Sequence, residues 1–240
     1  MASKPAEILI IVEGSKTEVT LLNRLIEVYN LSSKFEITSY GTHIYALYHS
    51  MFRGKDPSDL DIRTHLRSRE DNEVKKALLE KKFTDIFLIF DLDPHDSQYS
   101  PQIIREMMAF FNESTEMGKL YINYPMIESF YHMKCIPDAD FNTYSINMDK
   151  LSPKNQYKEI INQICPDPRK FAASRQECTT VINQNIEKAH HRKGHTSEEQ
   201  IPEAANILEA QLNKLHNENS IAVLCTCAFY IAEYSSKLLD

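Results

Sequence analysis

Three acidic residues stand at the ends of two short apolar segments. Glu13 follows the apolar run at residues 7–12, and Asp91 and Asp93 follow the run at residues 85–90. Short apolar runs of this kind are typical of strands that are buried on both faces of a parallel sheet. Ligands of open parallel sheets bind beyond the carboxyl ends of the strands. If the two strands are neighbours, their carboxyl ends bring these three carboxylates into one small volume.

Three carboxylates in such a volume repel one another strongly unless a cation compensates their charge. Oxygen ligands with retained water suit Mg²⁺ or Mn²⁺. Asp91 and Asp93 can both turn toward one ion, because the chain has just left its strand there. The sequence therefore predicts a Mg²⁺ or Mn²⁺ site formed by Glu13, Asp91 and Asp93. The alternative is a strand-to-helix turn and two solvated loop aspartates.

Strands and helices are predicted to alternate in the first half of the chain. Strands are expected at residues 7–12, 35–40, 85–90 and 119–123. The first connecting helix is expected to begin with a capping box formed by Ser15 and Glu18. The polar stretch 53–69 is expected to be a surface loop. This order predicts an α/β fold, with a parallel four-stranded sheet and helices on both faces.

The second half of the chain has helical rather than strand-like patterning. Residues 149–240 contain no convincing strand and are predicted to form three or four helices. The apolar stretch 221–232 is much shorter than the ~20 residues of a membrane span and is interpreted as a buried helix. Cys225 and Cys227 would then point to different sides of that helix. We expect an α/β catalytic domain at residues 1–134 and a helical region at residues 135–240.

The composition is that of an acidic globular protein. The 240 residues carry a formal net charge of −7, whereas a protein that coats nucleic acid non-specifically is usually basic. The 5 cysteines include no CxxC pair, so the usual spacing of a zinc site is missing. Their odd number and the absence of a recognisable signal peptide favour free thiols and a cytoplasmic location.

Two short motifs in this strand context resemble those of a known domain. A buried strand that ends in Glu13-Gly14, then a helix, then a strand that ends in Asp91-x-Asp93 resembles the Toprim domain. The resemblance covers about residues 7–134. Residues 10–18 and 125–130 resemble the corresponding segments of the OLD-family and RloB-like Toprim nucleases of phage-defence systems. The resemblance implies a Toprim-like (Rossmann-like) sheet.

The resemblance also implies a role for each of five residues. Asp91 and Asp93 would hold the metal ion. Glu13 would be a metal ligand or a general acid/base at the scissile phosphate. Lys16 could contact the same phosphate, and Glu128 could supply a further carboxylate after the fourth strand.

The activity implied in this way is Mg²⁺-dependent hydrolysis of phosphodiester bonds in DNA or RNA. An anti-phage or toxin role in abortive infection is expected, under the control of a partner ATPase encoded nearby. The helical region is the candidate docking surface for that ATPase or for a second copy of the chain in a homodimer. No membrane partner is expected.

Two other functions stay open at this point. The acidic balance favours a non-catalytic Toprim-fold regulatory or assembly subunit. Residues 90–93 also resemble the motif of haloacid-dehalogenase (HAD-like) phosphatases, although Pro94 and His95 depart from that pattern. The most basic stretch, residues 188–195, either binds a nucleic-acid backbone or ends a helix, with Gly194 as its C-cap.

Overall fold

The computed structural model divides the chain into two compact units. The first contains Met1–Phe90 and Gln102–Tyr121, and the second contains Asp91–Pro101 and Ile122–Asp240. The domain division expected at residue 134 stays a prediction. The structure describes residues 8–53, 60–115, 117–151, 156–191, 201–234 and 236–239.

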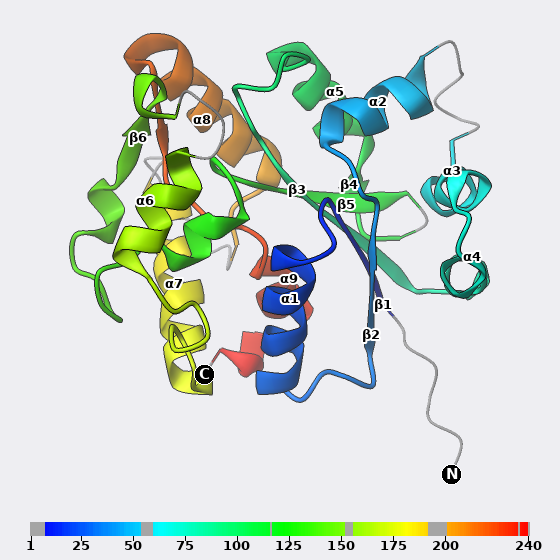
Figure 1. Cartoon of the computed structure of the whole chain (residues 1–240), viewed down its shortest axis with the longest axis horizontal. Coiled ribbons are helices and arrows are strands. Elements are labelled where there is room, and N and C mark those ends of the chain that lie inside the picture. The colour runs from blue at the N-terminus through cyan, green and yellow to red at the C-terminus, as the bar shows by residue number, and fades with distance from the viewer. Residues whose placement is uncertain are drawn as a thin grey trace. The chain divides into compact units, whose positions relative to one another are not determined.

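A mostly parallel sheet of five strands confirms the α/β class (Figure 1). Its strands are β1 (Ile8–Val12), β2 (Phe35–Ser39), β3 (Asp85–Asp91), β4 (Asn112–Glu113) and β5 (Gly118–Asn123). The four predicted strands all form, and the two-residue β4 pairs antiparallel with β5 as an additional fifth strand. The Toprim arrangement itself stays a proposal.

The strand order places a topological switch point between β1 and β3. The order is β2-β1-β3-β5-β4, and β1 pairs in parallel with both β2 and β3. The chain therefore moves from β1 to one side and then crosses to the other. Val12 is in register with Ile89, so the carboxyl ends of β1 and β3 lie at the same edge of the sheet. This edge is where open α/β sheets bind ligands.

The helices that connect these strands are α1 (Thr17–Val28), α2 (Ile44–Phe52), α3 (Ile62–Arg69), α4 (Glu73–Glu80) and α5 (Pro101–Phe110). The capping box predicted for α1 is wrong, because Lys16 is the N-cap residue and makes no side-chain cap hydrogen bond. The Glu18 carboxylate lies over Gly14 instead. A Cβ atom at Gly14 would be 2.7 Å from Glu18 Oε1.

The loop predicted for residues 53–69 is wrong in its second part, where α3 forms. Asp61 caps this helix, and its Oδ1 accepts from the Thr64 N–H at 2.6 Å. Ile62 and Leu66, four residues apart, are buried on one face of α3. A cap and one short apolar face are sufficient here because tertiary packing stabilises short helices. Residues 54–59 lie outside the described part of the chain.

The second unit is mostly helical. Its longer elements are β6 (Ser145–Asn147), α6 (Gln156–Ile164), α7 (Arg175–His191), α8 (Ala204–Glu218), β7 (Ser220–Ala222) and α9 (Phe229–Tyr234). Short 3₁₀ helices occur at η2 (Ile127–Tyr131), η3 (Phe141–Thr143), η4 (Met148–Lys150) and η5 (Ser236–Leu238). The helices expected in residues 149–240 are confirmed. Among the described residues, no helix combines the length and apolar character that crossing a membrane requires.

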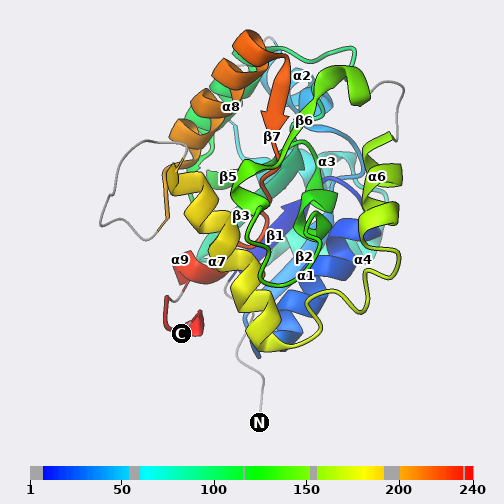
Figure 2. The same cartoon turned by 90° about the vertical axis from the view of Figure 1, so that its left-hand side faces the viewer.

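The expectation that residues 149–240 contain no strand is wrong, since β7 pairs antiparallel with β6. Figure 2 shows α8 running beside this pair. Asn219 ends α8 in the left-handed conformation, with φ of +48°, and the chain turns back. Gln211 on α8 then holds β7, because its side chain bonds both the N–H and the carbonyl of Ala222, at 2.9 and 3.0 Å.

Two glycines permit a matched test of packing around β5. Gly118 has a φ of +96°, and a Cβ atom there would lie 2.5 Å from Leu88 Cδ1. Gly41 has a φ of +87°, but a Cβ atom there would meet nothing within 4 Å. We predict that Gly118→Ala lowers the free energy of unfolding by about 2–5 kcal/mol, through backbone strain and overpacking. Gly41→Ala should lower it by about 1–2 kcal/mol, through strain alone. Urea denaturation of both variants measures the difference, and equal losses would contradict the packing described for β5.

Candidate functional site

Glu13 and Lys16 lie in the turn between β1 and α1, in the first unit. Glu13 is half-buried, and its N–H donates to the Ile89 carbonyl of β3 at 3.3 Å. Its own carbonyl accepts from the Gly41 N–H, just beyond β2, at 2.9 Å. Glu13 therefore stands at the carboxyl edge of three parallel strands. Lys16 is exposed at the amino end of α1.

Asp91 is the last residue of β3, in the second unit, and only 4% of it is exposed. Asn123 ends the neighbouring strand β5 and is fully buried. Its Nδ2 donates to Asp91 Oδ1 at 3.2 Å. Burial disfavours an ionised carboxylate unless hydrogen bonds or cations stabilise it. The Asn123 amide is one such partner, and it fixes the direction in which the Asp91 carboxylate points.

The same Asn123 side chain holds the loop between β7 and α9. Its Oδ1 accepts from the N–H groups of Thr226 and Cys227, at 3.2 and 3.1 Å. The Thr226 hydroxyl donates to the Ile122 carbonyl at 2.9 Å. A side chain that both donates and accepts is needed at this position, because the Asp91 carboxylate accepts a hydrogen bond and the N–H groups of the loop donate hydrogen bonds.

Cys225 and Cys227 belong to this loop, and the prediction that they point to different sides of a helix is wrong. Both are buried free thiols, and their Sγ atoms are 3.2 Å apart. Leu224 forms an antiparallel bridge with Tyr124, which keeps the chain extended before α9 begins. A continuous apolar run is compatible with a buried extended segment as well as with a buried helix.

Asp93 borders a cavity at the same end of β3. Its φ of +35° lies in the left-handed region, which aspartate tolerates better than most residues. The Asp93 N–H donates to the Pro125 carbonyl at 3.4 Å. The cavity has a volume of about 270 Å³ and is also lined by His95 and Tyr157. A ligand in this cavity would lie beside Asp93.

Glu128 is a second buried carboxylate of this unit. It lies in η2, and 7% of it is exposed. Its Oε1 is 3.2 Å from Lys158 Nζ of α6. Its Oε2 is buried and accepts no hydrogen bond within the part of the chain that the structure describes. A buried carboxylate oxygen without a partner marks a position where a further donor or cation could bind.

The Tyr157 hydroxyl connects these carboxylates electrostatically. Burial raises its pKa well above the ordinary value, and Cys225, Glu128 and Asp91 raise it further. The structure therefore brings Asp91 and Glu128 to the surroundings of one neutral phenol in the second unit. Asp93 lies in the same unit and shares a cavity wall with Tyr157.

The donor set of the second unit fits magnesium coordination in part. Among the described residues, no three or more His, Cys, Asp or Glu side chains are arranged to hold a metal ion. Mg²⁺, however, usually keeps several waters and takes one or two protein carboxylates. The Asp91 carboxylate and the unpartnered Glu128 Oε2 are oxygen ligands of the kind required.

Sequence patterns gave no indication of three residues of this site. Asn123 ends a predicted strand, so its place beside Asp91 was accessible in principle from the strand order. Tyr157 and Lys158 lie on α6, and their approach to η2 arises only from tertiary packing. No spacing in the sequence connects them to Asp91 or Glu128.

Within the basic stretch 188–195, Lys188 is buried and therefore cannot contact a nucleic acid. Lys188 is 1% exposed, and its Nζ donates to the Phe141 and Tyr144 carbonyls at 2.6 and 2.8 Å. The Nζ also lies 4.2 Å from the centre of the Phe141 ring. Buried lysines need partners of this kind. Residues 192–195, with the proposed C-cap Gly194, lie outside the described residues.

Comparisons with known proteins find no family model, no curated protein and no solved structure that matches this chain.

His132 lies beside Tyr157, with its Nδ1 3.0 Å from the Tyr157 hydroxyl. The pKa of His132 is lowered to about 4, mainly by burial and to a lesser extent by the nearby Lys188, while Asp138 opposes the shift. Folded His132 therefore stays neutral at pH values where the unfolded chain binds a proton. Stability contributed in this way is present above about pH 6.5 and is lost as the pH falls toward 4.

We predict that, between pH 7 and pH 5, the wild-type protein loses about 2 kcal/mol more unfolding free energy than His132→Gln. Glutamine keeps a polar side chain near Tyr157 but does not titrate. Urea denaturation at both pH values measures the difference. His216→Gln, which replaces an exposed histidine of α8, is the control and should behave like the wild type. The same pH dependence in wild type and His132→Gln would contradict the assignment.

Proposed function

We propose that this chain is a Mg²⁺-dependent nuclease of Toprim type that hydrolyses phosphodiester bonds of DNA or RNA. The observation that carries the proposal is the pair of buried carboxylates Asp91 and Glu128, of which Glu128 keeps one oxygen, Oε2, without a hydrogen-bond partner among the described residues. Asp91 ends a central strand of a parallel sheet, next to a switch point in strand order. Carboxylates in this position commonly serve a bound ion or substrate.

In the proposed site, Asp91, Asp93 and Glu128 would provide oxygen ligands for Mg²⁺ or Mn²⁺. An ion held there would supply Lewis-acid chemistry, that is, polarisation of a phosphoryl oxygen and stabilisation of the negative charge that develops during hydrolysis. Asn123 orients Asp91 through the hydrogen bond to Oδ1. Outer-shell partners of this kind hold a ligating carboxylate in its working geometry.

Hydrolysis requires water to attack phosphorus, the P–O ester bond to break, and the leaving oxygen to take up a proton. Glu13, at the end of β1, is our candidate for an additional metal ligand or for the general acid/base that transfers this proton. Lys16 is exposed at the amino end of α1, where a helix also attracts phosphate. We propose that Lys16 contacts the scissile phosphate.

The resemblance of the sequence to OLD-family and RloB-like nucleases supports a biological setting for this activity. We propose an anti-phage or toxin role under the control of a partner ATPase, because an unregulated nuclease would damage its own cell. The helical second half of the chain is the proposed surface for the ATPase or for a second copy.

A regulatory or assembly subunit is the second candidate function. The formal net charge of −7 and the burial of Lys188 both weaken the case for a strongly basic nucleic-acid surface. A subunit of this kind would bind its partner without cleaving nucleic acid. Loss of the Glu13 carboxylate would then be tolerated.

Cleavage of plasmid DNA, single-stranded DNA and RNA tests the proposed nuclease, in Mg²⁺ and in EDTA, with and without the product of the neighbouring gene. We predict that Asp91→Asn and Glu13→Gln each lower the Mg²⁺-dependent rate by about 100-fold or more. Asp85→Asn is the matched control, because Asp85 begins the same strand at its opposite end, and it should cleave like the wild type. Circular dichroism establishes that each variant is folded.

Wild-type cleavage rates in both Asp91→Asn and Glu13→Gln would overturn the mechanism. If the wild-type protein cleaves none of these substrates even with its partner, the assembly subunit becomes the better account.

A further inference from the structure

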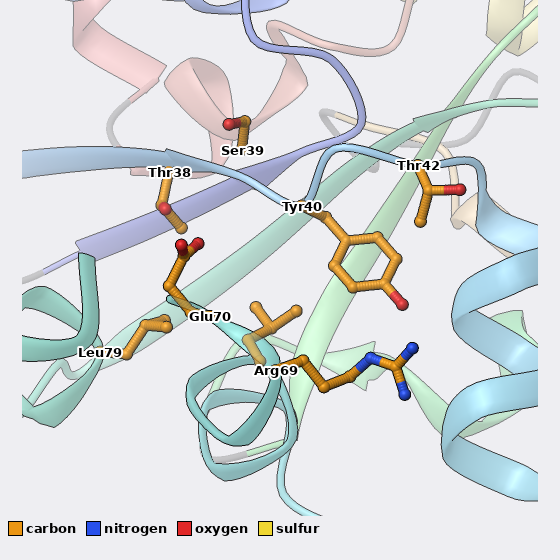
Figure 3. Close-up of a pocket in the computed structure, with 8 residues that line it drawn as sticks. Thr38, Ser39, Tyr40, Thr42, Arg69, Glu70 and Leu79 are labelled. Atoms are coloured by element: carbon orange, nitrogen blue, oxygen red, sulfur yellow. The ribbon is translucent and has the colours of Figure 1, made fainter. Parts of the chain in front are cut away.

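A polar pocket opens at the carboxyl end of β2 in the first unit, and no step of the proposed hydrolysis uses it (Figure 3). Its volume is about 200 Å³. The Tyr40 N–H donates to the Val12 carbonyl at 2.7 Å, so this turn continues the pairing of β2 with β1. Gly41 makes the turn with a φ of +87°. The pocket therefore lies along the same edge of the sheet as Glu13.

One wall of the pocket is rich in hydroxyl groups. Thr38, Ser39, Tyr40 and Thr42 all line it within five positions of the chain. The Tyr40 hydroxyl is 3.1 Å from Ser50 Oγ. Hydroxyl groups can donate or accept hydrogen bonds, and they rotate to suit a ligand. Such a wall suits an oxygen-rich ligand better than an apolar one.

The opposite wall contains an arginine whose charge is not compensated by an acidic group within the described structure. Arg67 of α3 pairs with Glu80 at 3.2 Å, and Arg63 donates to the Lys81 carbonyl at 2.9 Å. Arg69, the last residue of α3, has no hydrogen-bond or ion-pair partner among the described residues. Figure 3 shows its guanidinium on the side of the pocket toward which the Tyr40 hydroxyl points.

Glu70 also lines the pocket, but its charge is already compensated. The Asn72 N–H donates to its carboxylate at 2.9 Å, and Lys75 Nζ is 3.5 Å away. These contacts lower the pKa of Glu70, the Asn72 hydrogen bond most strongly. Lys75 Nζ also lies 3.3 Å from Ser39 Oγ, at the pocket wall. The negative charge of Glu70 and the positive charge of Lys75 cancel, so Arg69 gives the pocket a net positive charge.

A cation in the last turn of a helix also interacts favourably with the helix dipole, and this is the simplest role for Arg69. Arg67 occupies the same last turn and serves that role equally well. What distinguishes Arg69 is its place in a hydroxyl-lined pocket. The small volume excludes a whole dinucleotide, since pockets for drug-sized ligands have volumes of about 300–1,000 Å³.

We propose that this pocket binds one phosphoryl group of a nucleic-acid strand, held by the Arg69 guanidinium and the hydroxyl wall. The planar guanidinium matches two phosphate oxygens at once, and hydroxyl groups complete their hydrogen bonds. The inference rests on the proposed function in taking a nucleic-acid strand as the ligand. The pocket would hold a backbone phosphate away from the cleaved bond and fix the position of the strand.

Fluorescence anisotropy with labelled 12-nucleotide single-stranded DNA and RNA tests this site, in EDTA so that no metal-dependent cleavage occurs. We expect Arg69→Gln to weaken binding about tenfold, and the slope of log affinity against log salt to fall by about one. Arg67→Gln removes the same charge from the same helix and should leave affinity close to wild type. Both side chains are exposed, so neither change should affect folding.

Equal weakening by Arg69→Gln and Arg67→Gln would overturn the proposal, because general charge attraction would explain both. Absence of oligonucleotide binding by the wild type would also overturn it. Titration with inorganic phosphate distinguishes a free phosphate ion from a nucleic-acid strand as the ligand of the pocket. Phosphate binding that depends on Arg69, without any effect on the oligonucleotide, would overturn the assignment to a strand. Arg69-dependent binding by a protein that cleaves nothing would support the pocket and contradict the nuclease, so the two proposals fail separately.

Discussion

The side-chain amide of Asn123 is the interaction on which the candidate site of the second unit depends. It donates to Asp91 and accepts from two N–H groups of the loop that carries Cys225 and Cys227. Each buried group left without a partner costs about 1–3 kcal/mol. Only glutamine carries the same separate NH₂ donor and carbonyl acceptor, and glutamine is longer. One residue therefore positions both a carboxylate at the end of a strand and a loop that is distant in sequence.

Patterns in the sequence predicted the parts of the fold whose causes are local. β1 and β3 are continuous apolar runs, and all four predicted strands form within a residue or two of their expected limits. The errors have two physical causes. α3 depends on Asp61 and on a very short apolar face within a polar segment. β7 pairs with β6, which lies much earlier in the chain, so its apolar residues could equally have been helical.

The residues of the candidate site also include some that local sequence patterns predict and some that depend on tertiary contacts. Glu13, Asp91 and Asp93 could be proposed from the sequence because a carboxylate after a buried strand stands at a ligand-binding edge. Tyr157 could not, because its role arises from contacts between distant segments. The place of Asn123 beside Asp91 follows from the strand order, but its hydrogen bonds to the loop before α9 do not. Lys188 shows what a charge pattern alone leaves undecided. A basic stretch was considered for nucleic-acid binding, yet α7 buries this lysine against two backbone carbonyls. Charge in the sequence predicts a binding surface only where the fold leaves it exposed.

The proposed function requires a metal ion at Asp91, and anomalous scattering from crystals grown with Mn²⁺ detects such an ion directly. We predict one Mn²⁺ ion with an Asp91 carboxylate oxygen about 2.1 Å away. Asp91→Asn crystals grown under the same conditions should lack this ion. No ion at Asp91 in millimolar Mn²⁺, or an ion at the same place in Asp91→Asn, would contradict the proposed metal site.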